Sequence, residues 1–285
     1  MDIWPELYLT RVKFSLVVER ADEFARFPEA VLRGALGYFW HDEGERFSAL
    51  YDLFFGVREK GVHSGIATPP VGGMLECRRV DDKVFELNIT LFGNHEDKIS
   101  LLNESLIVLG REGVGARYVR FYVDGLPFFK TSSLRECLST ERIDGQTLPE
   151  SYCPSNGVRL DIVKPMTLKA VGGKFLMEWD AVTFFRNLVQ RLKLLSQFYG
   201  SPLSENWCAN LEELTQVRVA SATHQEMRSR RSSRQQANLD YSGFVGQVII
   251  RNISGHLFDL IRMGGIVGVG KNTVMGSGRY SISLL

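Results

Sequence analysis

The stretch YLTRVKFSLVV, residues 8–18, gives the clearest indication of the fold near the start of the chain. It is rich in β-branched and aromatic residues, and Val12, Phe14 and Leu16 alternate with polar residues. Successive side chains of a strand point to opposite faces, so this spacing predicts a strand with one buried face. A helix is expected next, over residues 28–42, because proline suits a helix start and apolar residues then recur three and four positions apart.

The rest of the first half continues this alternation. Two strands are predicted at residues 74–80 and 84–92, joined by the turn Asp81-Asp82-Lys83. A helix over about residues 96–109 and a strand over residues 116–123 follow. The order strand–helix–strand–strand–helix–strand is that of a ferredoxin-like domain, in which two helices cover one face of a four-stranded antiparallel sheet.

The second half repeats this order after a polar linker at residues 131–156. Its strands are predicted at residues 158–169, 217–223, 241–252 and 277–284, and its helices at residues 179–198 and 253–263. The sequence therefore predicts an α+β fold of two tandem ferredoxin-like domains, residues 1–130 and 157–285, with a cleft between their sheets.

The composition restricts the classes of function. A chain of 285 residues with 44% hydrophobic content can bury a substantial core, and no run approaches the ~20 apolar residues of a membrane span. The formal net charge is only +1, so nucleic-acid binding must be argued from local charge. The four cysteines form no CxxC pair, which argues against a zinc ribbon and favours a reducing, cytoplasmic location: Cys77, Cys137, Cys153 and Cys208.

The segment MRSRRSSRQQANLD, residues 227–240, concentrates positive charge between two predicted strands. Arg228, Arg230, Arg231 and Arg234 fall within seven residues, and Gln235 follows them. Guanidinium groups match phosphate oxygens, while serine and glutamine side chains can contact sugars and bases. A solvated charged loop is the plain alternative. The position beside an open sheet face favours RNA binding.

The segment GGIVGVGKNTVMGSG, residues 264–278, is the second candidate. Glycines such as Gly268 and Gly270 let backbone N–H groups approach a phosphate chain, and Lys271 and Asn272 add a cation and an amide. The spacing lacks the Ser or Thr that follows the lysine of a nucleotide-binding P-loop, which argues against an NTPase. The alternative is that the glycines only permit a tight turn between helix and strand.

The five histidines show no spacing typical of a metal site, so neither a metal nor another cofactor is expected. His41 lies at the predicted C-terminal end of the first helix. There it either takes part in catalysis or, when protonated, favours the helix dipole.

Several segments along the chain resemble the CRISPR precursor-RNA processing endoribonucleases of the repeat-associated mysterious protein superfamily, the sixth Cas family. The three C-terminal segments, in this order, are the most specific. The matching segments are LRGALG (32–37), LFG (91–93), GREGVG (110–115), RSSRQ (231–235), GFVG (243–246) and VGKNTVMGSGRY (269–280).

The resemblance implies a protein that binds CRISPR repeat RNA and cuts it without metal to mature guide RNA. The ribose 2′-hydroxyl attacks the adjacent phosphate, which leaves a 2′,3′-cyclic phosphate. It implies His41 and Tyr38 as catalytic residues, and it adds Arg33 and Arg279 to the RNA-binding residues. Other CRISPR effector subunits are the implied protein partners, and no membrane is expected.

One departure from the family concerns Gly268, since related chains carry a histidine two residues before the Gly-Lys pair of the C-terminal loop. This difference keeps open a second hypothesis, in which the chain is a non-catalytic subunit that holds guide RNA in a CRISPR effector complex. A third hypothesis is a protein scaffold whose arginine segment binds acidic partners.

Overall fold

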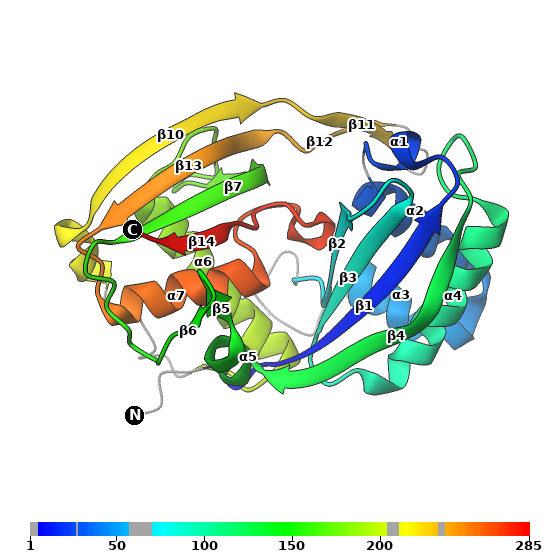
Figure 1. The fold of residues 1–285 in the computed structure, drawn as a ribbon, viewed down its shortest axis with the longest axis horizontal. Helices are drawn as coiled ribbons and strands as arrows, with labels where there is room; N and C mark the ends of the chain where they lie inside the picture. Colours follow the sequence, from blue (N-terminus) through cyan, green and yellow to red (C-terminus); the bar gives the residue numbers. More distant parts are fainter. Residues whose placement is uncertain (1–4, 27, 57–69, 204–210, 233–236) are drawn as a thin grey trace.

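The computed structural model describes residues 5–26, 28–56, 70–203, 211–232 and 237–285, with the backbone alone described at residues 211, 230–232 and 237–240. Two four-stranded antiparallel sheets, each covered by helices on one face, lie side by side (Figure 1). The fold is therefore the predicted pair of tandem ferredoxin-like domains.

The N-terminal sheet has the strand order β2-β3-β1-β4, and all its pairs are antiparallel. Val12, Phe14 and Leu16 of β1 are buried, as their alternation predicts. The elements are β1 (Tyr8–Val18), α1 (Ala21–Phe24), α2 (Pro28–Asp42), α3 (Ser48–Phe55), β2 (Gly73–Arg79), β3 (Val84–Phe92), α4 (Ile99–Glu112) and β4 (Phe121–Ser133).

The C-terminal sheet repeats this topology with the strand order β10-β13-β7-β14. Helix α6 begins where the Asp180 carboxylate accepts a hydrogen bond from the Thr183 backbone N–H at 2.7 Å, as an N-cap residue does. The elements are β7 (Val158–Met166), α6 (Ala181–Tyr199), β10 (Arg218–Glu226), β13 (Gly243–Arg251), α7 (Gly255–Val267) and β14 (Ser281–Leu284).

The remaining elements are short. Short 3₁₀ helices lie at η1 (Gly44–Phe47), η2 (Glu96–Lys98), η3 (Leu211–Gln216) and η4 (Thr273–Met275). A short helix and three two-stranded ribbons complete the fold: α5 (Leu134–Thr140), β5 (Arg142–Ile143), β6 (Gln146–Thr147), β8 (Leu168–Lys169), β9 (Phe175–Leu176), β11 (Ser229–Ser232) and β12 (Ala237–Asp240).

The strand predicted at residues 116–123 is displaced in the structure. Tyr118 has a φ of 51°, and a bridge between Val114 and Val119 closes a turn, so β4 begins only at Phe121. It then pairs with β1 as far as Ser133, into the predicted linker. Local turn geometry and pairing with β1 outweigh the β-propensity of this stretch.

The predicted polar linker, residues 131–156, also contains a helix that the sequence analysis missed. Ser133 and Glu136 form a reciprocal capping box at the start of α5. Leu134, Cys137 and Leu138 of α5 are buried in the core of the C-terminal domain. This segment is therefore part of the packed structure rather than a solvated connection.

Among the described residues, two ion pairs join the domains. Lys164 of β7 pairs with Glu29 in the first turn of α2, and the Glu29 carboxylate also accepts a hydrogen bond from the Cys77 backbone N–H at 2.9 Å. Arg279 Nη1 lies 2.9 Å from Oε2 of Glu76 on β2. Both carboxylates belong to the N-terminal domain and both cations to the C-terminal domain.

Candidate RNA interface

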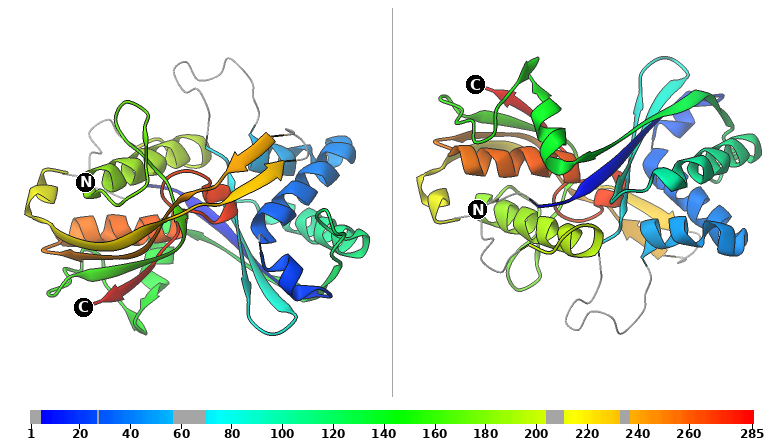
Figure 2. Two further views of the ribbon diagram at one scale, coloured as in Figure 1. Left: turned by 90° about the horizontal axis from the view of Figure 1, so that it is seen from above. Right: turned by 90° about the horizontal axis from the view of Figure 1, so that it is seen from below.

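The arginine segment forms an extension of the C-terminal sheet. Strands β11 and β12 pair antiparallel, with Arg230 opposite Leu239 and Arg231 opposite Asn238, and they continue β10 and β13 into a projecting hairpin. Figures 1 and 2 show that this hairpin extends past the sheet toward the helices of the N-terminal domain. The predicted RNA-binding residues Arg234 and Gln235 lie outside the described residues, as do the side chains of Arg230 and Arg231.

Arg228 lies at the base of this hairpin. Its Nε pairs with the Glu226 carboxylate, and its backbone N–H donates to Ser242 Oγ at 3.0 Å. The Tyr241 N–H donates to the Arg228 carbonyl at 2.8 Å across the hairpin. These contacts hold the base of the hairpin together, and RNA binding by Arg228 stays a prediction.

The glycine-rich segment is largely packed against the protein. Gly268 ends α7 with a φ of 72°, and Gly270 has a φ of 89°. A Cβ atom on Gly270 would lie only 2.3 Å from the Thr167 carbonyl oxygen. Farther along, Val274 is buried in the core of the N-terminal domain. The segment therefore connects the two domains, and its glycines permit close packing.

Part of this segment faces solvent. The Lys271 side chain is exposed, and its ammonium lies 4.7 Å from the ring centroid of Phe175. Asn272 follows in a left-handed conformation with a φ of 61° and is half-buried. Arg279 is half-buried in its ion pair with Glu76. Lys271 and Asn272 are thus the predicted residues of this segment most accessible to a phosphate chain.

The predicted catalytic residues lie together on α2. Tyr38 is 51% exposed, and the His41 side chain is 72% exposed one turn later. His41 Nδ1 lies 3.4 Å from the Asp42 carboxylate, and its ring centroid lies 5.9 Å from that of Tyr51. An exposed imidazole beside a phenol can exchange protons with a ligand on this surface.

The partners of Arg33 and His41 on α3 form an aromatic row that the sequence analysis missed. The Arg33 guanidinium lies 4.2 Å from the Phe55 ring centroid, and Phe55 stacks on Tyr51 at 4.9 Å. Tyr51 in turn faces His41. Arg33 also donates to the Phe54 carbonyl at 3.2 Å. The spacing of Tyr51 and Phe55, four residues apart in a helical stretch, was the available sequence signal.

Of the three predicted parts of the site, the structure brings the arginine segment and the glycine-rich segment together. The catalytic candidates on α2 lie apart from them. A small cavity of about 40 Å³ is lined by the first turn of α2, the hairpin base and the end of the glycine-rich segment, through residues that include Glu29, Arg228 and Ser277. His41 lies twelve residues beyond Glu29, which corresponds to ~18 Å along the helix. The catalytic candidates are therefore separated from the glycine-rich segment by most of the length of α2.

In the described part of the chain, no three His, Cys, Asp or Glu side chains gather as metal ligands. None of the helices described is both long and apolar enough to cross a membrane.

Comparison with known proteins finds a family that matches the C-terminal domain. Residues 160–280, nearly all of the C-terminal domain, match the family CRISPR-associated endoribonuclease Cas6. Over this region the chain is similar to that family. A search among curated protein sequences found no match.

Solved Cas6 structures share the fold at low sequence identity. Thermus thermophilus Cas6 superposes with a TM-score of 0.57 at 15% identity, over 97% of this chain and 98% of that chain. A Cas6 product complex gives 0.60 at 13% identity, over 96% and 98%. A partial Cas6-RT-Cas1–Cas2 complex gives 0.59 at 12% identity, over 99% of this chain and 47% of that chain. These likenesses show that the fold of both domains is shared with these structures.

Proposed function

We propose that this protein binds CRISPR repeat RNA and cleaves it without metal to mature guide RNA. The Cas6 family match over residues 160–280 is the observation that carries this proposal. The product complex among the structural relatives concerns a Cas6 protein of the same fold, which supports an RNA ligand here.

The cleavage step is a transesterification. A base removes the proton of the ribose 2′-hydroxyl, and the 2′-oxygen forms a bond to the adjacent phosphorus. The bond from phosphorus to the 5′-oxygen breaks, and an acid protonates that oxygen. The products are a 2′,3′-cyclic phosphate and a free 5′-hydroxyl, and a nearby cation stabilises the charge on the phosphate as the bonds change.

His41 and Tyr38 are the proposed catalytic pair. Both are exposed on one surface of α2, and Tyr51 packs beside the His41 ring. A neutral histidine accepts a proton near neutral pH, and a tyrosine hydroxyl can donate a hydrogen bond to phosphate or to the leaving oxygen.

The proposed binding surface consists of the hairpin and the exposed part of the glycine-rich segment. The sequence of the hairpin concentrates arginines on a projection beyond the sheet (Figure 1), which can attract the phosphates of an RNA. Lys271 and Asn272 add an exposed cation and an amide. The full proposed set is Arg33, Arg228, Arg230, Arg231, Arg234, Gln235, Gly268, Gly270, Lys271, Asn272 and Arg279.

A single 2′-deoxy substitution in the repeat RNA tests this chemistry. Placed at the nucleotide before the scissile phosphate, it removes the nucleophile and leaves every phosphate in position. We expect binding to be retained and cleavage to be lost. Cleavage of the 2′-deoxy RNA at the same bond would reject 2′-hydroxyl attack.

A second candidate function is a non-catalytic subunit that holds guide RNA. It is favoured by Gly268, where related chains carry histidine, and by the ~18 Å along α2 between its first turn and His41. Binding of repeat RNA without any cleavage by the wild-type protein would select this function.

The expected setting is a cytoplasmic CRISPR complex in which the protein stays on its product and contacts other effector subunits. The described cysteines Cys77, Cys137 and Cys153 are free thiols, which is consistent with a reducing compartment.

A further inference from the structure

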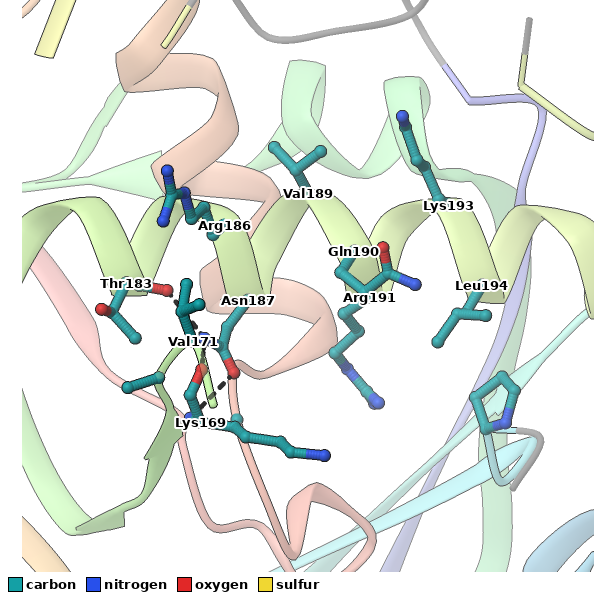
Figure 3. Close-up of a pocket in the computed structure, with 13 residues that line it drawn as sticks. Lys169, Val171, Thr183, Arg186, Asn187, Val189, Gln190, Arg191, Lys193 and Leu194 are labelled. Carbon is teal, nitrogen blue, oxygen red and sulfur yellow. Dashed lines mark hydrogen bonds between the residues drawn. The ribbon is translucent and has the colours of Figure 1, made fainter. Parts of the chain in front are cut away.

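A second basic surface lies on the side of α6, away from the arginine hairpin. A cavity of about 590 Å³ is bounded by α6, by the turn after β8, by Pro70 and by Gly270 of the glycine-rich segment (Figure 3). The sequence analysis assigned no role to the residues of α6 that line it.

The charged side chains that line this cavity are all positive. Four cations line it, Lys169, Arg186, Arg191 and Lys193, and no acidic side chain does. None of the four has a carboxylate within 4.0 Å in the described part of the chain. Like charges that gather without counter-charges repel one another, so an anion bound here lowers the free energy of the site.

Arg191 is the most deeply set of the four. Its Nε donates to the Val267 carbonyl at the end of α7 at 2.8 Å, and its guanidinium lies 5.6 Å from the Phe92 ring centroid. Burial lowers the pKa of Arg191 to about 10, which still leaves the group charged at neutral pH. A largely desolvated cation that has no carboxylate beside it in the described part of the chain is costly, and the N–H groups that Val267 does not occupy can donate to an anion.

The walls of the cavity are held in place. Asn187 of α6 donates to the Lys169 carbonyl at 3.0 Å and accepts from the Lys169 N–H at 3.1 Å. These two bonds fix the end of β8 against the helix. Figure 3 shows Lys169 and Arg191 extending to one side of α6 and Arg186 and Lys193 to the other. Cations from α6 and from β8 therefore lie on both sides of the helix (Figure 3).

The size and continuity of this surface favour a polyanion over a single phosphate ion. Arg186 and Lys193 are seven residues apart, which separates them by ~10 Å along the helix axis. Successive phosphates of one polyanion chain span this distance, so such a chain can contact both cations at once. Gly270 lines the cavity, and the exposed Lys271 follows it directly, so the surface continues into the proposed RNA-binding segment.

We propose that the α6 cavity binds the sugar–phosphate backbone of the same repeat RNA, beyond the part held by the arginine hairpin. This inference rests on the proposed function, because it assumes that the ligand of the hairpin is RNA. The cavity acts as a second, sequence-independent contact that fixes the path of the RNA across the glycine-rich segment.

The test compares two double variants with equal loss of charge. Arg186→Gln/Lys193→Gln neutralises the cavity, whereas Lys83→Gln/Arg142→Gln removes two exposed cations elsewhere. Affinity for repeat RNA is measured by filter binding over a range of salt concentrations. The salt slope is the slope of the logarithm of the binding constant against the logarithm of the salt concentration. We expect the cavity variant to bind about tenfold more weakly and to lower the salt slope by about 1.4, from two lost phosphate contacts. The control should bind like wild type.

Equal affinity and equal salt slope for the cavity and control variants, with tight binding by wild type, would overturn the inference and leave the proposed function intact. Failure of wild type to bind repeat RNA would instead reject the proposed function. A second variant, Gln190→Glu, places a negative charge in the exposed centre of the same helix face. It should also weaken RNA binding, and unchanged affinity for this variant would count against the cavity as well.

Discussion

The close packing of the glycine-rich segment predicts a specific stability effect for Gly270→Ala. The new Cβ would lie 2.3 Å from the Thr167 carbonyl oxygen, and the residue would keep a φ of 89°. Gly172 is the matched control, because it has a φ of 82° and a Cβ there would have no heavy atom within 4 Å. The two substitutions share the backbone strain, and only Gly270→Ala adds a steric clash.

The magnitudes follow from these two contributions. A left-handed alanine costs about 1 kcal/mol, which is the whole effect expected for Gly172→Ala. Displacing a buried backbone carbonyl adds about 2 kcal/mol for Gly270→Ala, giving about 3 kcal/mol in total. With roughly 2–4 °C per kcal/mol for a chain of this size class, Tm should fall by roughly 6–12 °C for Gly270→Ala and 2–4 °C for Gly172→Ala.

Thermal unfolding followed by circular dichroism measures this difference. Lys271→Ala, in the same experiment, should leave Tm near that of wild type. The Lys271 side chain is exposed, so its truncation removes no core contact. If Gly270→Ala and Gly172→Ala lowered Tm by the same amount, the close approach of residue 270 to the Thr167 carbonyl would make no contribution to the loss of stability. The interpretation of the segment as a packing element would then fail.

Three further predictions concern catalysis, binding and the domain junction. His41→Ala should abolish cleavage and spare repeat-RNA binding in a gel-shift assay, and full activity would discard His41 as acid or base. Arg231→Ala/Arg234→Ala should weaken RNA binding and lower the salt slope by about 1.4, and an unchanged slope would remove the hairpin from the interface. Lys164→Met should destabilise the protein by about 3 kcal/mol in urea unfolding, because Glu29 keeps a buried charge without its partner. A much smaller loss of unfolding free energy would show that burial of the Glu29 carboxylate does not depend on its ion pair with Lys164.

The elements with regular periodicity could be predicted from the sequence. The predicted bounds of β1 and α2 agree with the structure, because alternation in β1 and the proline start of α2 are local signals. The position of β4 could not be predicted in the same way. Its start depends on a left-handed turn at Tyr118, and its length depends on pairing with β1. By contrast, the capping box at Ser133 and Glu136 was a readable signal for α5.

For the candidate site, the residue types could be predicted from the sequence, whereas their arrangement depends on contacts between distant segments. Composition alone indicates a basic segment at residues 227–240, but not that it extends as a hairpin beyond the sheet. The packing of the glycine-rich segment depends on Thr167, which lies more than one hundred residues from Gly270. The cations of α6 were missed because they are spread at helical intervals among apolar residues, and only the folded structure places them around one cavity.

Cleavage of repeat RNA by the purified wild-type protein in excess EDTA tests the central claim most directly. Mass spectrometry of the upstream fragment identifies its 3′ end. The proposed function predicts cleavage at one bond, with a 2′,3′-cyclic phosphate on the upstream fragment and a 5′-hydroxyl on the downstream one. Binding without cleavage, or cleavage that EDTA abolishes and divalent metal restores, would contradict it.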